Sequence, residues 1–460
     1  MKKSKLLLLS VFFSLTLYAQ PHLKGTIEID KQLGIIKCVF TLSKIPQIEA
    51  YSILLNKGMN ITYFKDPKGE LLDYNGYYNG KMEGEAIAYA LGSNASSPKK
   101  LPSTFIIDYV GAFPVYKNDY NSFDFKGNIA INEKTLRAAE QTKWYPVLYD
   151  TKNDKVIHSY TYDLHIKTKD SSTIFINGSA PKKGTDVRLT STIAYPLLLF
   201  MGDYEYKSYS GDYILNTDIS DDTSAFIFKN IEEIKNYYAT RLELDFTDHM
   251  YIINHESVKK RKKGSSWGFN TYPAFAFTGL NFKDLVSVKN RFSEGTLKFF
   301  GHEFGHNYFG NNVMSGPLSW FWSESFAEYL SFGVALNLGS ESFLKDVLLH
   351  HAKVVKEGTF IPLNKIKTKK EIGEKYRYSL GPMILQCFED TFGKKQMNLI
   401  IQTLLKTAAS ETLTLDAFKR AALNSGIDKK AYGKFHKMYI ANKKFKEHVV
   451  KRIEEDYGSK

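Results

Sequence analysis

Cysteine is nearly missing from this sequence, with only two among 460 residues. A cysteine-based metal cluster and a framework of disulfides are therefore both excluded. Cys38 and Cys387 each lie in an apolar stretch, which favours two buried free thiols. A disulfide between them, formed in an oxidising compartment, is the alternative.

Long hydrophobic runs are also missing, except at the N-terminus. Three lysines within the first five residues precede an apolar run over residues 6–17, and Ala19 follows it. This pattern predicts a signal peptide over residues 1–19 that is cleaved after Ala19; an uncleaved anchor is the alternative. The longest later run, residues 193–201, is too short to cross a membrane. We therefore expect a secreted or periplasmic protein without an integral membrane span.

The composition is that of a folded chain, with 43% hydrophobic and 24% charged residues. It excludes a disordered or fibrous protein, and the length is enough for two or three domains. A formal net charge of +13 and the basic run 259–263 raise nucleic-acid binding as one possibility. The export signal and the lack of a recognition motif argue against nucleic acid as a partner. The basic run is interpreted as a solvated loop, with attraction to acidic substrates or an anionic envelope as the alternative.

The hydrophobic periodicity changes along the chain. Between residues 22 and 205, apolar and polar residues alternate in short runs separated by turn signals, which predicts an antiparallel β domain. Beyond residue 285 the spacing becomes i, i+3, i+4, as at Met397, Ile400 and Ile401, which indicates helices. The predicted fold class is therefore α+β and multidomain. Its expected parts are the signal peptide over 1–19, a β-rich domain over 20–207, a mostly helical domain over 208–395, and a helical segment over 396–460 that closes it.

The sharpest motif is His302-Glu303-Phe304-Gly305-His306. On a helix, residues i and i+4 lie on the same face, so His302 and His306 can bind one metal ion. Glu303 is rotated by about 100° and can reach a water molecule on that ion. We expect Gly310 to end this helix. Two hydrogen-bonded or solvated histidines without a metal are the alternative.

A third ligand follows at a suitable distance. Glu324 comes after a loop that contains Gly316 and Pro317, so the chain can return as a second helix that presents this carboxylate to the histidines. Two histidines, one carboxylate and a water molecule form the usual four-coordinate catalytic zinc site. The sequence therefore predicts one Zn²⁺ per chain, bound by His302, His306 and Glu324.

Further polar residues lie near this motif in the sequence. Glu328 is on the same helix face as Glu324 and is predicted to accept a hydrogen bond from the outer nitrogen of His302 or His306. A solvated helix glutamate is the alternative. His350 and His351 are expected on a helix surface, in a structural role.

Residues 302–330 resemble the aminopeptidase N family of gluzincin zinc metallopeptidases. The shared residues are His302, Glu303, His306, Phe309, Gly310, Asn311, Trp320, Glu324, Phe326 and Ala327. The resemblance implies a thermolysin-like catalytic domain that hydrolyses peptide bonds, with Glu303 as the general base. The segment between His306 and Glu324 is one residue shorter than in the family.

A tyrosine segment extends the resemblance. Tyr378-Ser379-Leu380-Gly381 is similar to the family's Tyr-x-Lys-Gly. This implies that Tyr378 donates a hydrogen bond to the developing oxyanion, where a well-placed phenol stabilises the transition state. Tyr376 is the nearby rival, and an ordinary structural tyrosine is the alternative.

Two departures from the family are visible. The family's Gly-Ala-Met-Glu-Asn segment recognises a free N-terminal amine, but residues 264–272 contain no glutamate to pair with an ammonium. Trp267, Gly268 and Tyr272 fit that segment and are predicted to lie along an extended substrate as an edge strand. The chain also has no room for the family's large C-terminal helical domain, so it resembles a short, divergent member.

Together these features predict an exported zinc metallopeptidase that acts on a peptide or protein. One alternative is a true aminopeptidase whose amine-binding carboxylate lies elsewhere, such as in the N-terminal domain. Another is a non-catalytic peptide-binding protein that retains the gluzincin fold. The oligomeric state stays open.

Overall fold

The computed structural model describes residues 20–78, 85–94, 99–117, 124–246, 248–256, 258, 267–279, 282–285 and 291–458. The predicted signal peptide and its cleavage site after Ala19 lie outside these residues, as does the basic run 259–263. Among the described residues, no helix combines the length and the apolar character needed to cross a membrane. Cys38 and Cys387 are both buried and free, which confirms the favoured interpretation of the two thiols.

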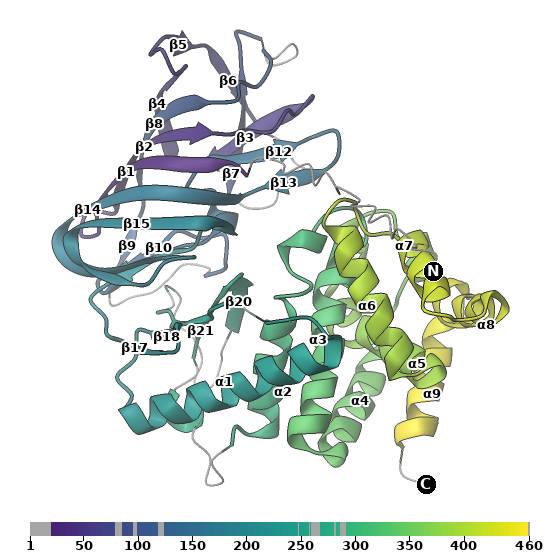
Figure 1. Ribbon diagram of the computed structural model, residues 1–460. Helices are drawn as coiled ribbons and strands as arrows, with labels where there is room; N and C mark the ends of the chain where they lie inside the picture. The colour runs from purple at the N-terminus through teal and green to yellow at the C-terminus, as the bar shows by residue number, and fades with distance from the viewer. Residues whose placement is uncertain are drawn as a thin grey trace, which may run out of the picture.

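The N-terminal domain consists of strands arranged in two sheets (Figure 1). The larger sheet has the order β5-β4-β8-β2-β1-β14-β16-β11-β10-β9, with β15 paired to β14, and the smaller has the order β13-β12-β3-β7-β6. The strands are β1 (His22–Asp30), β2 (Ile35–Ser43), β3 (Tyr51–Asn56), β4 (Met59–Lys65), β5 (Leu71–Leu72), β6 (Tyr74–Tyr77), β7 (Ala86–Leu91), β8 (Phe105–Ala112), β9 (Val115–Tyr116), β10 (Ala130–Asn132), β11 (Thr135–Ala138), β12 (Val147–Asp150), β13 (Lys155–Ile157), β14 (Ser159–Ile176), β15 (Lys182–Pro196) and β16 (Leu199–Gly202).

Alternating burial explains how these strands pack. In β2, Ile36, Cys38 and Phe40 are buried while Lys37 and Val39 between them are more exposed, so one face of the sheet is apolar. That face shares a single core with the smaller sheet, to which Ile53 in β3 contributes. The β domain is thus a pair of sheets packed face to face.

The β domain is mostly antiparallel, as predicted, but two of its strand pairs are parallel. β1 pairs with β14 in parallel, with His22 opposite Thr161, and β9 pairs with β10 in parallel. β1 and β14 are separated by many elements, whereas β9 and β10 follow one another in the chain and are joined by residues 117–129, since parallel strands need a long connection. Local alternation of polar and apolar residues indicates a strand but not the direction of its partner.

The second domain begins with a five-stranded sheet of order β17-β18-β19-β21-β20 and continues into helices (Figure 1). Its elements are β17 (Tyr206–Tyr209), β18 (Asp212–Leu215), α1 (Asp221–Leu242), β19 (Tyr251–Asn254), β20 (Trp267–Thr271), β21 (Ala274–Thr278), α2 (Glu294–Gly305), α3 (Phe326–Val334), α4 (Glu341–Lys356), α5 (Gly381–Phe392), α6 (Lys394–Ala408), α7 (Leu415–Asn424), α8 (Lys429–Phe435) and α9 (Phe445–Tyr457). The predicted boundary between residues 207 and 208 therefore cuts through β17, and the one between residues 395 and 396 cuts through α6.

Side-chain caps start several of these helices. The hydroxyl of Ser220 accepts a hydrogen bond from the Thr223 amide at the start of α1, and Ser293 does the same for α2. Thr414 caps α7 as predicted from the sequence. Such caps satisfy amides that have no partner within the helix. Helices α1 to α9 and one face of the sheet then share one apolar core, so residues after 395 belong to the same packing unit.

A third apolar cluster joins the two domains. Phe175 and Phe200 of the larger N-terminal sheet are buried together with Ile253 and Ala276, which belong to the five-stranded sheet of the second domain. Figure 1 shows the sheet of the second domain between the β domain and helices α1 and α2. Because the contact is apolar, it holds the β domain beside the helix that carries the histidine motif.

Candidate metal centre and active site

Helix α2 presents the two histidines. His302 lies in its last turn, and the helix ends at Gly305 rather than at the predicted Gly310. The last turns tighten, because the amides of His306 and Asn307 bond to carbonyls three residues back. His306 itself keeps right-handed helical angles, with φ −67° and ψ −12°. The two imidazoles therefore stay on one face, and their ring centroids are 4.9 Å apart.

Glu324 reaches this face from a neighbouring helix. It lies in a π-helical turn, η4 (Phe321–Ser325), which leads directly into α3. Gly305 makes the close approach of the two helices possible, because a Cβ at this position would lie 2.9 Å from the Cα of Ala327. The glycine inside the histidine motif thus has a packing role.

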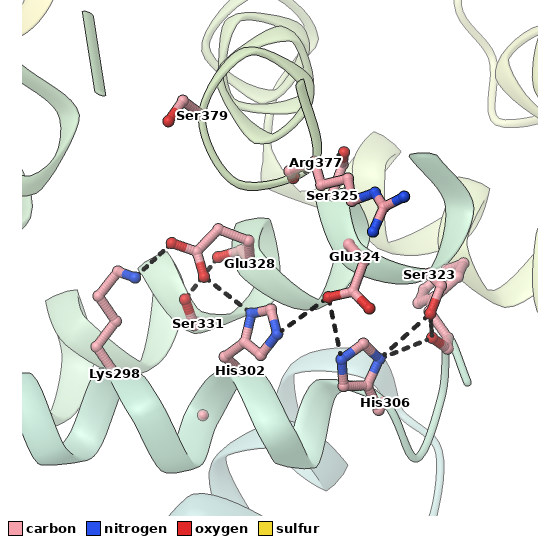
Figure 2. Close-up of polar contacts among 12 residues, drawn as sticks. Lys298, His302, His306, Ser323, Glu324, Ser325, Glu328, Ser331, Arg377 and Ser379 are labelled. Carbon is pink, nitrogen blue, oxygen red and sulfur yellow. Dashed lines mark hydrogen bonds and ion pairs between the residues drawn. The ribbon is translucent and has the colours of Figure 1, made fainter. Parts of the chain in front are cut away.

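His302, His306 and Glu324 form a compact donor set (Figure 2). The Oε2 atom of Glu324 is 3.4 Å from Nε2 of His302 and 3.5 Å from Nε2 of His306. The three ligand atoms all lie within 4.8 Å of one another, and both histidines are buried. Two nitrogens and one carboxylate oxygen in this arrangement are the donor set of a catalytic zinc site.

The outer nitrogens of the two imidazoles already have protein partners. Nδ1 of His302 lies 2.8 Å from Oε2 of Glu328, and Nδ1 of His306 lies 3.1 Å from the carbonyl oxygen of Phe309. Both Nε2 atoms are thereby directed toward Glu324. This is the arrangement in which outer partners orient metal-binding histidines, so these residues fit a zinc ion.

The electrostatics of the site also favour a cation. Burial lowers the pKa of His302, but hydrogen bonds to Glu324 and Glu328 outweigh burial and raise it to about 10. For the same reason the pKa of Glu324 lies well below its usual value: burial opposes ionisation, and the charge and hydrogen bonds of the two histidines outweigh it. The carboxylates of Glu324 and Glu328 thus stay ionised beside the imidazoles, where a divalent cation would be stabilised.

Glu328 of α3 has partners on three sides. Besides His302, it contacts Lys298, which lies one turn earlier on α2, and Nε2 of His351 is 3.4 Å from its Oε1 atom. The predicted surface position of His351 is therefore wrong. This histidine is only 9% exposed, and its Nδ1 lies 3.1 Å from the hydroxyl of Ser379. Its side chain points inward because α4 packs against the turn that carries Ser379.

Glu303 lies beside the donor set and lines the same cavity. Its side chain is buried, and burial raises its pKa above the usual value. The side-chain amide of Asn270 in β20 donates a hydrogen bond of 3.1 Å to the backbone carbonyl of Glu303. The edge strand β20 and the helix that carries the carboxylate are therefore held together at this point.

The structure distinguishes the two candidate tyrosines. Both belong to a second π-helical turn, η8 (Tyr376–Leu380), and such turns occur often at functional sites. Tyr378 lines the cavity, with its ring centroid 5.7 Å from that of His302. Burial and the charges of Glu324 and Glu303 raise its pKa, so its hydroxyl stays protonated and can donate. Tyr376 is fully buried against Phe360 and does not line the cavity.

The donor set opens into a cleft of about 260 Å³ between the two domains. The β domain supplies one wall, and the helical domain supplies the wall with the metal ligands. The residues lining it are Lys126, Glu140, Gln141, Lys143, Tyr149, Asp154, Val156, His158, Gly268, Phe269, Asn270, His302, Glu303, His306, Gly310, Met314, Ser315, Gly316, Trp320, Ser323, Glu324, Lys369 and Tyr378.

Of the three residues predicted to lie along a substrate, one lines this cleft. Gly268 does so, and β20 is the edge strand of its sheet, as the prediction requires. Trp267 stacks on Phe269, with ring centroids 5.4 Å apart, and Tyr272 packs against Tyr195 beyond the end of β20. Neither Trp267 nor Tyr272 lines the cleft, which corrects the prediction. Instead, Gly268, Phe269 and Asn270 are the residues of β20 that line the cleft.

The β domain contributes residues to the cleft that no sequence motif indicates. Glu140, in a short 3₁₀ turn (Glu140–Thr142), and Lys126 both line the cleft and form an ion pair there. Neither belongs to a motif, and both are far from residue 302 in the sequence. In the sequence, Glu140 is simply an acidic residue that follows Ala138 and Ala139, and this pattern does not indicate a functional site.

No family model and no curated protein matches this chain. Solved structures do match it over most of its length. Yeast LTA4 hydrolase superposes with a TM-score of 0.62 at 12% identity, over 92% of this chain and 68% of that chain. An M1 zinc metallopeptidase from Deinococcus radiodurans superposes with a TM-score of 0.61 at 11% identity, over 91% of this chain and 94% of that chain.

These similarities concern the fold of the chain. A β-sheet domain followed by a helical domain, in this order and arrangement, is the fold of the M1 zinc metallopeptidases and of LTA4 hydrolase. The predicted α+β, multidomain architecture is thereby confirmed. Fold alone does not establish an activity, which depends on the residues of the site.

Proposed function

We propose that this protein is an exported zinc metallopeptidase that hydrolyses peptide bonds. The observation that carries the proposal is the convergence of His302, His306 and Glu324 at the base of a cleft, with Glu303 and Tyr378 in the same cavity. Similarity of fold supports it, and one of the similar structures, a mutant of the Deinococcus radiodurans enzyme, holds a Tyr-Ser-Ala substrate.

Each residue has a distinct role in this proposal. His302, His306 and Glu324 hold Zn²⁺, which when bound polarises the scissile carbonyl and lowers the pKa of water. Glu303 takes a proton from the attacking water and passes it to the leaving amine. The hydroxyl of Tyr378 donates a hydrogen bond to the oxygen on which negative charge develops. The cleft walls from the β domain position the peptide.

A true aminopeptidase is the second candidate, and one observation favours it. Glu140 of the β domain places a buried carboxylate in the cleft, only 5% exposed. A carboxylate is the group that pairs with a substrate ammonium. In this second candidate, Glu140 on the opposite wall takes the place of the glutamate that is missing from residues 264–272.

The test is mass-spectrometric cleavage of a mixed peptide library with free and with acetylated N-termini. The zinc-loaded protein is compared with a chelator-treated sample and with Glu303→Gln, which we expect to bind zinc but to lose hydrolysis. Chelator-sensitive internal cuts in both sets support the peptidase. Loss of single residues from free N-termini alone supports the aminopeptidase, and no cleavage of any kind favours a binding protein.

Export is part of the same proposal and has a separate test. The predicted cleavage after Ala19 is checked by N-terminal sequencing of the protein recovered outside the cytoplasm. An N-terminus at Gln20 supports it. A protein that keeps residues 1–19 would contradict it.

A further inference from the structure

Lys126 and Glu140 form an ion pair on the wall of the cleft that faces the metal ligands. Nζ of Lys126 lies 2.5 Å from Oε1 of Glu140. The same ammonium donates a hydrogen bond of 2.6 Å to the backbone carbonyl of Asn270, and it lies over the ring of Phe269 at 5.7 Å. All four residues line the cleft, so the lysine is held by both of its walls.

The charge of Glu140 is already compensated within the chain. Its Oε2 atom accepts a hydrogen bond of 2.8 Å from the hydroxyl of Thr271, and its Oε1 atom pairs with Lys126. Burial raises the pKa of Glu140, but the charge of Lys126 and the hydrogen bonds from Lys126 and Thr271 outweigh burial and leave it below the usual value. The carboxylate is thus ionised and has an ammonium partner from this protein itself.

This pair is connected to the catalytic helix through one residue. The backbone carbonyl of Asn270 accepts from Lys126, and its side-chain amide donates to the backbone carbonyl of Glu303. A peptide whose scissile bond lies beside Glu303 and which runs along the edge strand β20 therefore passes the ammonium of Lys126. An N-terminal ammonium arriving at Glu140 would have to displace this lysine and leave it without its anionic partner.

We propose that Lys126 occupies the place of a substrate's N-terminal ammonium, so that the cleft takes peptides without a free amine next to the scissile bond. The substrate class is then internal peptide bonds or N-acylated ends. This inference rests on the proposed peptidase function and selects between its two candidate forms. Lys126 is the specificity-determining residue, and its removal would expose Glu140 to an incoming ammonium.

The test uses two zinc-binding probes that differ only at the amine, leucine hydroxamate and N-acetyl-leucine hydroxamate. Their affinities for the zinc-loaded full-length protein are measured by calorimetry. We expect the wild type to bind both about equally. Lys126→Met should favour the free amine by about 10- to 100-fold, the range of a hydrogen-bonded charge pair. Lys126→Arg, which keeps the cation, should behave like the wild type.

A double variant tests whether Glu140 is the group that binds the free amine once Lys126 is removed. Lys126→Met with Glu140→Gln removes both charges, and we expect its preference for the free amine to disappear. If Lys126→Met does not fold, Lys126→Gln replaces it, because its amide can still donate to Asn270. Zinc content and thermal melting report folding for each variant.

Two results would overturn this inference but leave the proposed function in place. The first is a wild type that already binds leucine hydroxamate tenfold more tightly than its N-acetyl form. The second is a folded, zinc-loaded Lys126→Met or Lys126→Gln whose ratio of affinities for the two hydroxamates equals that of the wild type. A wild type that binds no zinc, or neither hydroxamate, would instead refute the proposed function, and the inference would fall with it. Zinc stoichiometry measured on the same samples separates the two cases.

Discussion

His302 and Glu328 are joined across two helices by a contact of 2.8 Å between Nδ1 and Oε2. The histidine belongs to α2 and the glutamate to α3, and Lys298, one turn before His302, contacts the other oxygen of the same carboxylate. The imidazole is therefore oriented by the protein before any ion binds (Figure 2). Such an outer partner makes the ligand nitrogen more basic and reduces the entropy lost on metal binding.

Replacing this carboxylate should weaken the metal site without removing it. For Glu328→Gln we expect zinc affinity to fall by about 10- to 100-fold, as for other outer partners of metal-binding histidines. The measurement is competition with a fluorescent zinc chelator. Glu341→Gln is the matched control, because Glu341 is exposed on α4 and pairs only with Lys345 among the ion pairs described. Equal zinc affinity in both variants would show that Glu328 has no role in orienting His302.

The two tyrosines of the π-helical turn should differ in their effect on catalysis. For Tyr378→Phe we expect kcat to fall by about 10²- to 10³-fold with little change in KM, because the hydroxyl acts where charge develops. Tyr376→Phe is the control, since Tyr376 is buried away from the cleft. Steady-state kinetics on a cleaved peptide measures both. A loss of kcat in Tyr376→Phe alone would reverse the assignment.

Zinc removal should lower the stability of the folded chain. A ligand that binds only the folded state stabilises it by about 2.7 kcal/mol when its concentration is a hundred times Kd. We therefore expect chelation to lower the Tm and one equivalent of zinc to restore it. His306→Ala removes one ligand and should abolish this response. A wild-type Tm that does not respond to zinc would contradict the assigned metal centre.

His158 should make stability depend on pH at mildly acidic values. Burial, opposed by Glu140 and reinforced by Lys143 and Lys126, lowers the pKa of His158 from 6.5 to about 4. Between these values the unfolded chain binds a proton that the folded chain does not, so this residue makes stability fall as the pH falls from about 6.5 to 4.

The variant His158→Gln removes that difference in proton binding. We expect the free energy of unfolding of the variant, relative to wild type, to rise as the pH is lowered through this window. Urea denaturation at a series of pH values measures it. Parallel pH profiles for the two proteins would show that His158 titrates normally in the folded state.

The convergence of the candidate metal ligands could be predicted from the sequence because their geometry is local. The spacing of His302 and His306 places both on one helix face whatever the rest of the chain does. Glu324 follows after a short loop, so its approach to the histidines needs only a helical hairpin. The positions of the helices, such as the one capped by Thr414, follow from periodicity and capping residues in the same way.

The contacts that shape the cleft depend on packing between distant segments. Lys126, Glu140 and His351 carry no pattern that distinguishes them from surface residues, and each is brought to the site by an element far away in the chain. The parallel pairing of β1 with β14 is a contact of the same kind. Alternation within either strand does not show the direction of its partner, because parallel and antiparallel strands share the same two-residue side-chain period.

A few adjacent residues of the sequence thus predict the candidate metal site, but they do not predict which residues form the opposite wall of the cleft. Spacing along one helix specifies where His302, Glu303 and His306 point, because backbone hydrogen bonds fix that geometry within a single turn. Which charged side chains line the rest of the cleft depends on the apolar contact that holds the β domain against the sheet of the second domain and so places Lys126 and Glu140 in the cleft. That contact joins residues from strands of both domains, so it depends on packing between segments that are far apart in the sequence.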